Sequence, residues 1–236
     1  MKKIVHQILV TMTLCCMFQH THAQQRRAPS LNFGLQIAQP LGQFGTVYDG
    51  YPAGLAGTFS GPIGRSPFEI GIGGAWNSMG SQSEDVSAFA GVDADGDSIY
   101  EQGTMRIRSN MNRFQVLARF RPFNGMIQPY GDLVMGAETF KTKTDITLDN
   151  NGYTEANNDV RQHFAMTYSY GWAAGLRIRI ADNIFIDGRF ESLTGGMVSF
   201  VDQESIQVID ESNITFDLNE SRTDKYTFQL GLAIGF

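Results

Sequence analysis

Tyr226 to Phe236 reads YTFQLGLAIGF and supplies the pattern on which the fold assignment rests. Apolar side chains stand at every second position, a period of two that places them on one face of a β-strand. They are Tyr226, Phe228, Leu230, Leu232, Ile234 and Phe236. The side chains between them are small or polar. The stretch therefore predicts an amphipathic strand, either at the edge of a soluble β-sandwich or in the wall of a barrel.

The same alternation recurs along the chain. We expect eight strands, at about residues 31–38, 53–63, 68–77, 105–122, 127–141, 164–180, 184–191 and 226–236. Short turns at about 64–67, 124–125 and 181–183 alternate with long loops at about 39–52, 80–104, 142–161 and 199–222. All long connections therefore fall at one end of the sheet. A sandwich has no reason to keep this order, whereas membrane barrels combine short turns at one rim with long loops at the other.

The last eight residues carry a second signal. They resemble the closing signature of outer membrane β-barrels, in which a polar residue is followed by glycine two positions later and by apolar residues at the sixth and eighth positions. Gln229, Gly231, Ile234 and Phe236 occupy these positions. In that family the barrel assembly machinery reads the signature. Together with the loop pattern, it makes the chain from residue 31 onward resemble the opacity-like, OmpX-type (PorT-like) outer membrane barrels.

This resemblance implies an all-β fold, an eight-stranded antiparallel up-and-down transmembrane β-barrel over residues 31–236. Short turns would face the periplasm and four long loops would lie outside the cell. Because a barrel has no free edge, the strand that ends at Phe236 should pair with both the seventh and the first strand. Members of the family include adhesins, surface resistance factors, small-solute channels and a few lipid enzymes, so the fold by itself selects no activity.

Residues 1–23 have the layout of a secretory signal peptide. Lys2 and Lys3 precede an apolar segment, and small residues stand before the expected cleavage site at Gln24. Residues 24–30 would then form a short disordered periplasmic leader. No later stretch approaches the ~20 apolar residues of a membrane helix. These features predict export to the outer membrane of a Gram-negative cell, with the chain crossing the bilayer as strands.

Composition excludes several classes of site and partner. The net charge of −6 argues against nucleic acid as a partner. Cys15 and Cys16 lie in the signal segment, and His163 is the only histidine beyond it. Metal sites built on histidine or cysteine are therefore not expected, and nothing in the sequence calls for another cofactor.

The charged side chains of the expected strands share one parity. Within the apolar stretches of the eight strands, the apolar face carries no Asp, Glu, Lys or Arg, and an Arg or Lys facing lipid near the midplane would cost roughly 2–4 kcal/mol. The charged face must therefore point into the barrel, where eight strands leave room for little more than side chains. We expect it to form a plug of ion pairs from Glu69, Arg119, Arg121, Asp132, Glu138, Arg177, Arg179, Asp187, Arg189, Glu191 and Lys225.

Two hairpins should supply the principal pairs near the periplasmic end. The expected partners are Arg119 and Arg121 with Asp132, and Arg177 and Arg179 with Asp187. An unpaired charge in that confined space would be strongly destabilising. A plug of this kind predicts the absence of porin-sized conductance.

An acidic segment in the second long loop resembles the start of a calcium-binding loop. Asp93, Asp95 and Asp97 have the required spacing of carboxylates. Position twelve, however, is Thr104 where a calcium loop needs a bidentate Glu. The alternative is a solvated acidic loop that faces outward.

His163 suggests a lipid hydrolase, because some outer membrane barrels deacylate lipid A with a histidine, a serine and an acid. Ser169 lies too far along the same strand to share a proton with His163, so a serine from a loop would be needed. We expect no catalytic residues.

The function indicated by the sequence is that of a non-enzymatic outer membrane barrel with a filled interior and surface loops for interaction or envelope structure. Expected partners are outer membrane lipids, lipopolysaccharide and the barrel assembly machinery, with an extracellular protein or matrix contacting the loops. The alternatives are a narrow channel or translocon-associated barrel, a lipid hydrolase, and a soluble periplasmic barrel.

Overall fold

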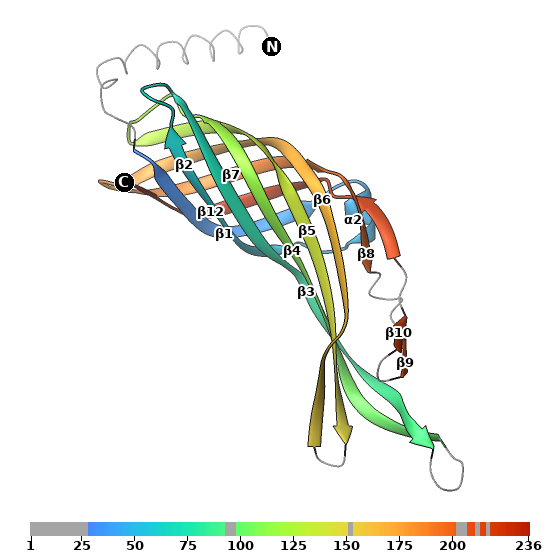
Figure 1. Cartoon of the computed structure of the whole chain (residues 1–236). Coiled ribbons are helices and arrows are strands. Elements are labelled where there is room, and N and C mark those ends of the chain that lie inside the picture. Colours follow the sequence, from blue (N-terminus) through green and yellow to red (C-terminus); the bar gives the residue numbers. More distant parts are fainter. Residues whose placement is uncertain (1–27, 93–97, 151–152, 202–206, 211–212, 216–217) are drawn as a thin grey trace.

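A computed structural model describes residues 28–92, 98–150, 153–201, 207–210, 213–215 and 218–236 (Figure 1). The expected signal peptide and most of the expected leader lie outside the described residues, as do Asp93, Asp95 and Asp97. Within the part of the chain that is described, no helix is both long enough and apolar enough to cross a membrane.

Eight antiparallel strands form a closed barrel, which confirms the predicted fold class. The wall consists of β1 (Ser30–Pro40), β2 (Ala53–Pro62), β3 (Phe68–Val92), β4 (Ser98–Phe120), β5 (Ile127–Asn150), β6 (Tyr153–Ala181), β7 (Ile184–Gly195) and β12 (Lys225–Gly235). Each strand pairs with its neighbours in order around the wall, and pairing of β3 with β4 completes the circuit. The chain therefore runs up and down without crossovers among these strands.

The closing strand β12 pairs with β1 on one side and β7 on the other. Its backbone approaches β1 closely where Gly231 faces Gly34. A Cβ on Gly231 would lie 2.1 Å from the carbonyl oxygen of Phe33, so only glycine fits there without a shift of the backbone. The backbone N–H of Phe236 donates to the carbonyl oxygen of Pro29 at 3.0 Å. Because β12 pairs with both β1 and β7, no edge of the sheet is left unpaired at the C-terminal strand.

The eight strands fall into two length classes. β1, β2, β7 and β12 contain 11, 10, 12 and 11 residues, whereas β3, β4, β5 and β6 contain 25, 23, 24 and 29. The long strands continue past the barrel as two hairpins, at the end opposite to the C-terminus (Figure 1). We call this four-stranded extension the projecting sheet.

The projecting sheet corrects the predicted loops at 80–104 and 142–161, which are mostly strand. β3 stays paired with β4 as far as Val92 and Ser98, and β5 with β6 as far as Asn150 and Tyr153. Polar side chains predominate in these stretches, so the apolar alternation that identifies a half-buried strand is weak there. Continued backbone pairing keeps the strands, and one face of them is buried at Met105, Ile107 and Thr144.

Two further connections contain structure where loops were expected. The segment 39–52 holds the short helix α2 (Gln43–Val47). The last long connection holds β8 (Met197–Val201), β9 (Gln207–Asp210), β10 (Asn213–Thr215) and β11 (Leu218–Arg222). β8 pairs with β11, while β9 pairs with β10 and touches β3.

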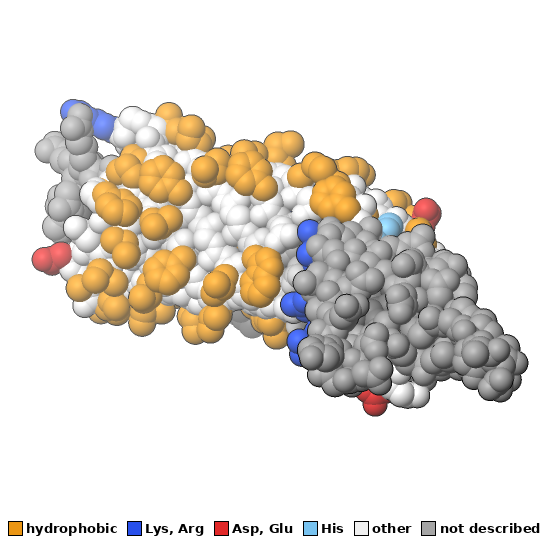
Figure 2. Space-filling view, turned by 60° about the horizontal axis from the view of Figure 1, so that its bottom comes forward, with side chains coloured by type: hydrophobic (Ala, Val, Ile, Leu, Met, Phe, Trp, Pro, Cys, Tyr) orange, Lys and Arg blue, Asp and Glu red, His pale blue; other side chains and the backbone are white. Residues whose placement is uncertain are grey.

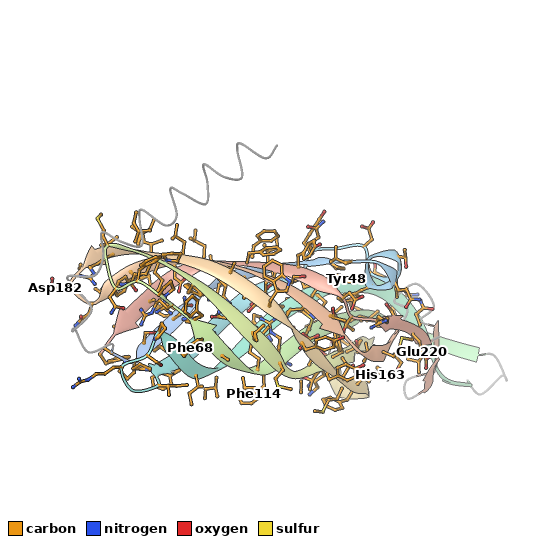
Figure 3. All side chains as sticks on the ribbon, turned by 90° about the horizontal axis from the view of Figure 1, so that it is seen from above. Tyr48, Phe68, Phe114, His163, Asp182 and Glu220 are labelled. Carbon is orange, nitrogen blue, oxygen red and sulfur yellow. The ribbon has the colours of Figure 1, made fainter. Side chains whose placement is uncertain are left out.

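The barrel is inverted relative to a water-soluble protein, with its apolar residues outside and its charges inside. Leu35 and Leu133 are 71% and 70% exposed, whereas Glu138 and Asp187 are fully buried. Apolar side chains cover the outer surface between the two ends of the barrel (Figure 2). Figure 3 shows Phe114 pointing away from the barrel, with Asp182 at the turn end and Glu220 at the loop end.

Candidate functional site

The interior near the turn end is filled by paired charges from neighbouring strands. Arg119 on β4 donates from Nε and Nη2 to the two carboxylate oxygens of Asp132 on β5, at 2.8 and 3.0 Å. Arg121 donates from Nε to Glu69 on β3 at 2.8 Å and from Nη1 to Gln128 at 2.8 Å. All five side chains are buried. The bidentate geometry satisfies the carboxylate of Asp132 without water.

A second group surrounds Asp187 on β7. Arg177 donates to it from Nε at 2.8 Å, the hydroxyl of Tyr130 donates at 2.7 Å, and the side-chain amide of Asn32 donates at 2.5 Å. The Tyr130 ring also lies under the Arg119 guanidinium, 4.0 Å from ring centroid to Cζ. Tyr130 therefore joins the first group to the second through a cation–π contact and a hydrogen bond.

Further along the barrel, Arg189 links the groups into one network. It contacts Asp132 through Nη1 and donates from Nε to Glu191 at 2.8 Å. Glu191 also accepts from Arg113 and, at 2.7 Å, from the hydroxyl of Thr227. A separate pair joins Lys225 to Glu138 at 2.5 Å. We call the whole set the ion-pair network, and its charged members come from β3, β4, β5, β6, β7 and β12 or from the residue that follows β4.

The structure brings together most of the charges selected from sequence, although two of them differ in partner. Arg119 and Arg177 lie against Asp132 and Asp187 across the two expected hairpins. Arg121, one step nearer the turn, pairs with Glu69 because Arg119 and Arg189 already occupy Asp132. Arg179 donates from Nη2 to the backbone oxygen of Asn124 at 3.1 Å, in place of the expected pair with Asp187.

Arg113 is the charged network member that sequence reasoning missed. It stands immediately before Phe114, where the apolar alternation of the fourth predicted strand begins. Its parity matches that of Arg119, six positions later. The inward-facing positions 115, 117 and 119 form a series, and extending it by one step toward the N-terminus would have identified Arg113.

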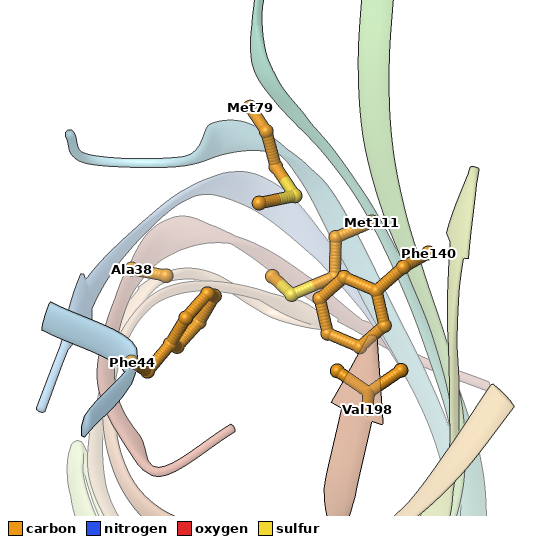
Figure 4. Close-up of a cluster of buried hydrophobic side chains, with 6 residues drawn as sticks. All are labelled: Ala38, Phe44, Met79, Met111, Phe140 and Val198. Carbon is orange, nitrogen blue, oxygen red and sulfur yellow. The ribbon is translucent and has the colours of Figure 1, made fainter. Parts of the chain in front are cut away.

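The loop end of the interior is closed by a different chemistry. Six buried apolar residues pack there, which we call the apolar cap: Ala38, Phe44, Met79, Met111, Phe140 and Val198. Figure 4 shows them converging on the barrel axis from the wall strands, from α2 and from β8. A polar solute entering from the loop side would have to cross this apolar layer before reaching the ion-pair network.

Helix α2 positions the centre of the cap. Gly42 takes φ 55° just before the helix, a conformation that glycine adopts without strain, and the chain turns so that Phe44 is fully buried. The Phe44 ring packs edge-on against Phe140, with centroids 6.2 Å apart. The hydroxyl of Tyr48 donates to the backbone oxygen of Met79, and burial raises the pKa of that hydroxyl.

The four residues of the expected assembly signal all lie in β12 or at its end. Gln229 is buried and donates to the side-chain oxygen of Asn32 at 2.7 Å. Gly231 provides the close approach to β1, and Phe236 is 68% exposed at the turn-end rim. Ile234 is half-buried beside Leu31 and Ile184.

His163 of β6 lies beside Ser199 of β8. Its Nε2 lies 3.1 Å from the backbone oxygen of Ser199, which is not a nucleophile. Ser169 is buried in the barrel wall six residues further along β6, about 20 Å away at strand spacing. Among the described residues, no three His, Cys, Asp or Glu side chains are grouped as metal ligands would be.

Of the three comparisons with known proteins, only the one with solved structures found similar proteins. No family model and no curated protein matches the chain. Ail, the attachment invasion locus protein of Yersinia pestis in complex with the heparin analogue sucrose octasulfate, aligns over 90% of this chain and 100% of its own, at 14% identity and TM-score 0.45. A major outer membrane protein from Thermus thermophilus aligns over 89% and 100%, at 10% identity and TM-score 0.45. Neisserial surface protein A aligns over 88% and 96%, at 11% identity and TM-score 0.37. The strand register of the chain itself, described above, establishes the barrel.

Proposed function

We propose that this chain is an integral outer membrane β-barrel protein that conducts no solute and acts through its projecting sheet. The observation that carries the proposal is the inversion of the barrel. Among the described residues of the eight wall strands, the outward side chains between the two rims carry no charge, while the inward ones form the ion-pair network. A lipid bilayer tolerates a barrel whose outer surface carries no charge, whereas water does not favour such a surface.

The dimensions of the wall support a bilayer. A transmembrane β-strand needs about 9–11 residues. The four short strands have 10 to 12. Outward-facing aromatic side chains stand toward both rims, as expected for the interfaces of a membrane. They are Trp76, Tyr168, Tyr170 and Tyr226 on the loop side and Phe68, Phe120 and Phe236 on the turn side.

Two layers inside the barrel support the absence of conductance. The ion-pair network fills the interior from the turn end up to the Lys225–Glu138 pair, with fully buried charges such as Arg119, Arg177 and Glu69. The apolar cap covers the loop end. Passage would require breaking buried ion pairs, each of which costs about 3–5 kcal/mol to disrupt when one partner is lost.

The projecting sheet supports an interaction role. It continues the wall on one side only, so a broad sheet stands beyond the barrel. A partner protein, matrix or lipopolysaccharide would meet this surface first. Within the described residues, the apolar cap lies across the path that a channel would need.

The test uses the full chain refolded into lipid vesicles. Unboiled protein should migrate faster than boiled protein on a gel, because a folded barrel resists detergent. External protease should cut only the loop-side segments, and planar bilayers should show no stable steps of porin size. A chain that stays soluble without lipid, or one that conducts like a porin, would refute the proposal.

A further inference from the structure

Four basic residues lie side by side on the outward face of β4 and β5. They are Arg106, Arg108, Lys141 and Lys143, and we call them the basic patch. Arg108 is directly opposite Lys143, and Lys141 is opposite Asn110 on the same two strands. Arg106 and Arg108 are exposed, and the two lysines are half-buried. The patch therefore presents its cations to the outside of the wall.

The patch begins where the apolar band of the wall ends. Lys141 is paired across the sheet with Phe164, which is 61% exposed on β6. Phe114, 60% exposed, stands four residues nearer the turn end than Asn110 on β4. Figure 2 shows Lys and Arg side chains gathered where the hydrophobic surface gives way to the loop side. Cations at this height would lie level with lipid headgroups.

Within the described residues, the patch holds more cations than carboxylates. Like charges directly opposite on neighbouring strands repel each other, and Arg108 and Lys143 stand in that relation. Asp145 forms an ion pair with Arg108 and is opposite Arg106. Asp85, opposite Thr104, lies one step further from the barrel. Among the described residues, the register thus places these two carboxylates beside four cations.

Hydroxyl groups border the patch on its other side. Ser81 and Ser83 of β3 are exposed and stand directly opposite Arg108 and Arg106. Arginine forks and serine hydroxyls are the donors that phosphate oxygens prefer. An exposed apolar surface directly below them suits acyl chains.

We propose that the basic patch binds the phosphates of a phosphorylated glycolipid of the outer leaflet, with the acyl chains of that lipid lying along Phe164 and Phe114. This inference rests on the proposed function, because it needs the barrel to sit in a membrane with its loop end outward. Two rows of cations on adjacent strands suit a headgroup that carries more than one phosphate. The site fixes one lipid to one side of the barrel.

The experiment measures binding of bis-phosphorylated lipid A to the full chain in mixed detergent micelles, by native mass spectrometry. The test variant replaces all four patch residues: Arg106→Gln, Arg108→Gln, Lys141→Gln and Lys143→Gln. The matched control replaces two exposed arginines elsewhere, Arg65→Gln in a turn and Arg222→Gln on β11. Dephosphorylated lipid A and inorganic phosphate serve as competing probes.

We expect the wild type and the control to bind lipid A at least tenfold more tightly than its dephosphorylated form, and the test variant to lose this preference. Raising the salt concentration should weaken the binding of lipid A by the wild type more than by the test variant. Equal binding of both lipids by the wild type would overturn the inference, as would displacement of lipid A by millimolar inorganic phosphate. The unboiled gel shift is read in the same samples. If it is present while phosphate preference is absent, only this inference fails; if it is absent, the proposed function fails.

Discussion

The two halves of the barrel interior are filled by opposite kinds of side chain. The first half holds the ion-pair network, in which buried charges pair with each other from the turn end up to Lys225 and Glu138, and the second half holds the apolar cap at the loop end. In the first half, each side chain is fixed by its partners in direction as well as position, because hydrogen bonds are directional. In the second half, only volume and contact have to match. The difference teaches that the two halves should respond very differently to the loss of one side chain.

The largest effect is expected from Asp132→Ala in the ion-pair network. The change leaves Arg119 and Arg189 buried without their shared carboxylate, and we expect a loss of about 3–5 kcal/mol in the free energy of unfolding. Urea unfolding of the vesicle-inserted protein, followed by the gel shift, measures it. Asp132→Asn should lose nearly as much free energy of unfolding, because it removes the negative charge while it keeps the side-chain volume.

The control for that variant is Asp182→Ala, at an exposed turn position. It should stay within about 0.5 kcal/mol of the wild type, as surface changes usually do. If Asp132→Ala were as mild as Asp182→Ala, the turn-end half would be hydrated and loose, and the contrast between the two halves would disappear.

A somewhat smaller effect is expected from Phe44→Ala in the apolar cap. Loss of a buried Phe costs about 3–5 kcal/mol, and the value here should lie near 3 because a five-residue helix can settle into the space. Conductance should remain absent, since the ion-pair network still fills the barrel below. Protease should cut the segment around α2 faster.

Val47→Ala provides the matched control, because Val47 lies on the same helix but is 38% exposed. It should leave protease sensitivity unchanged. Ion conduction through Phe44→Ala would show that the cap alone closes the barrel.

The smallest effect is expected from Tyr48→Phe, which removes the hydrogen bond to the Met79 carbonyl. At neutral pH the loss should be about 1 kcal/mol. Burial raises the pKa of Tyr48 above its ordinary value of 10.0, so the folded state holds the proton more tightly than the unfolded state. The contribution of this hydroxyl is therefore complete below about pH 10 and is lost as the pH rises through the raised value.

The stability difference between the wild type and Tyr48→Phe should consequently shrink at strongly alkaline pH. Tyr51→Phe serves as the control, because Tyr51 is 66% exposed in the same connection. A difference that stays constant well beyond the ordinary tyrosine pKa of about 10 would mean that the hydroxyl is not held by the cap.

The second contrast in the molecule, between the wall and the projecting sheet, shows where pattern-based prediction stops. Strands in the wall were predicted to within a few residues at several ends, β2 and β7 among them, because each must alternate between lipid and interior. Strands β3 to β6, by contrast, were predicted too short, because the prediction ended each of them where the chain leaves the apolar band. Stretches such as Thr142 to Asn150 consist mostly of polar side chains, so they lack the strong apolar alternation of the wall.

The sequence by itself determined the number of wall strands, their order and which face of each carries charge. These are local properties, since a period of two is visible within one strand. Only the tertiary structure decided that Arg121 meets Glu69, that Arg113 meets Glu191 across the barrel and that Phe44 reaches Phe140. These contacts depend on the relative register of strands far apart in the chain, and on how a helix of five residues folds back over the mouth. Neither leaves a periodic trace in the sequence, because closure of the barrel, and not any single strand, brings the partners together.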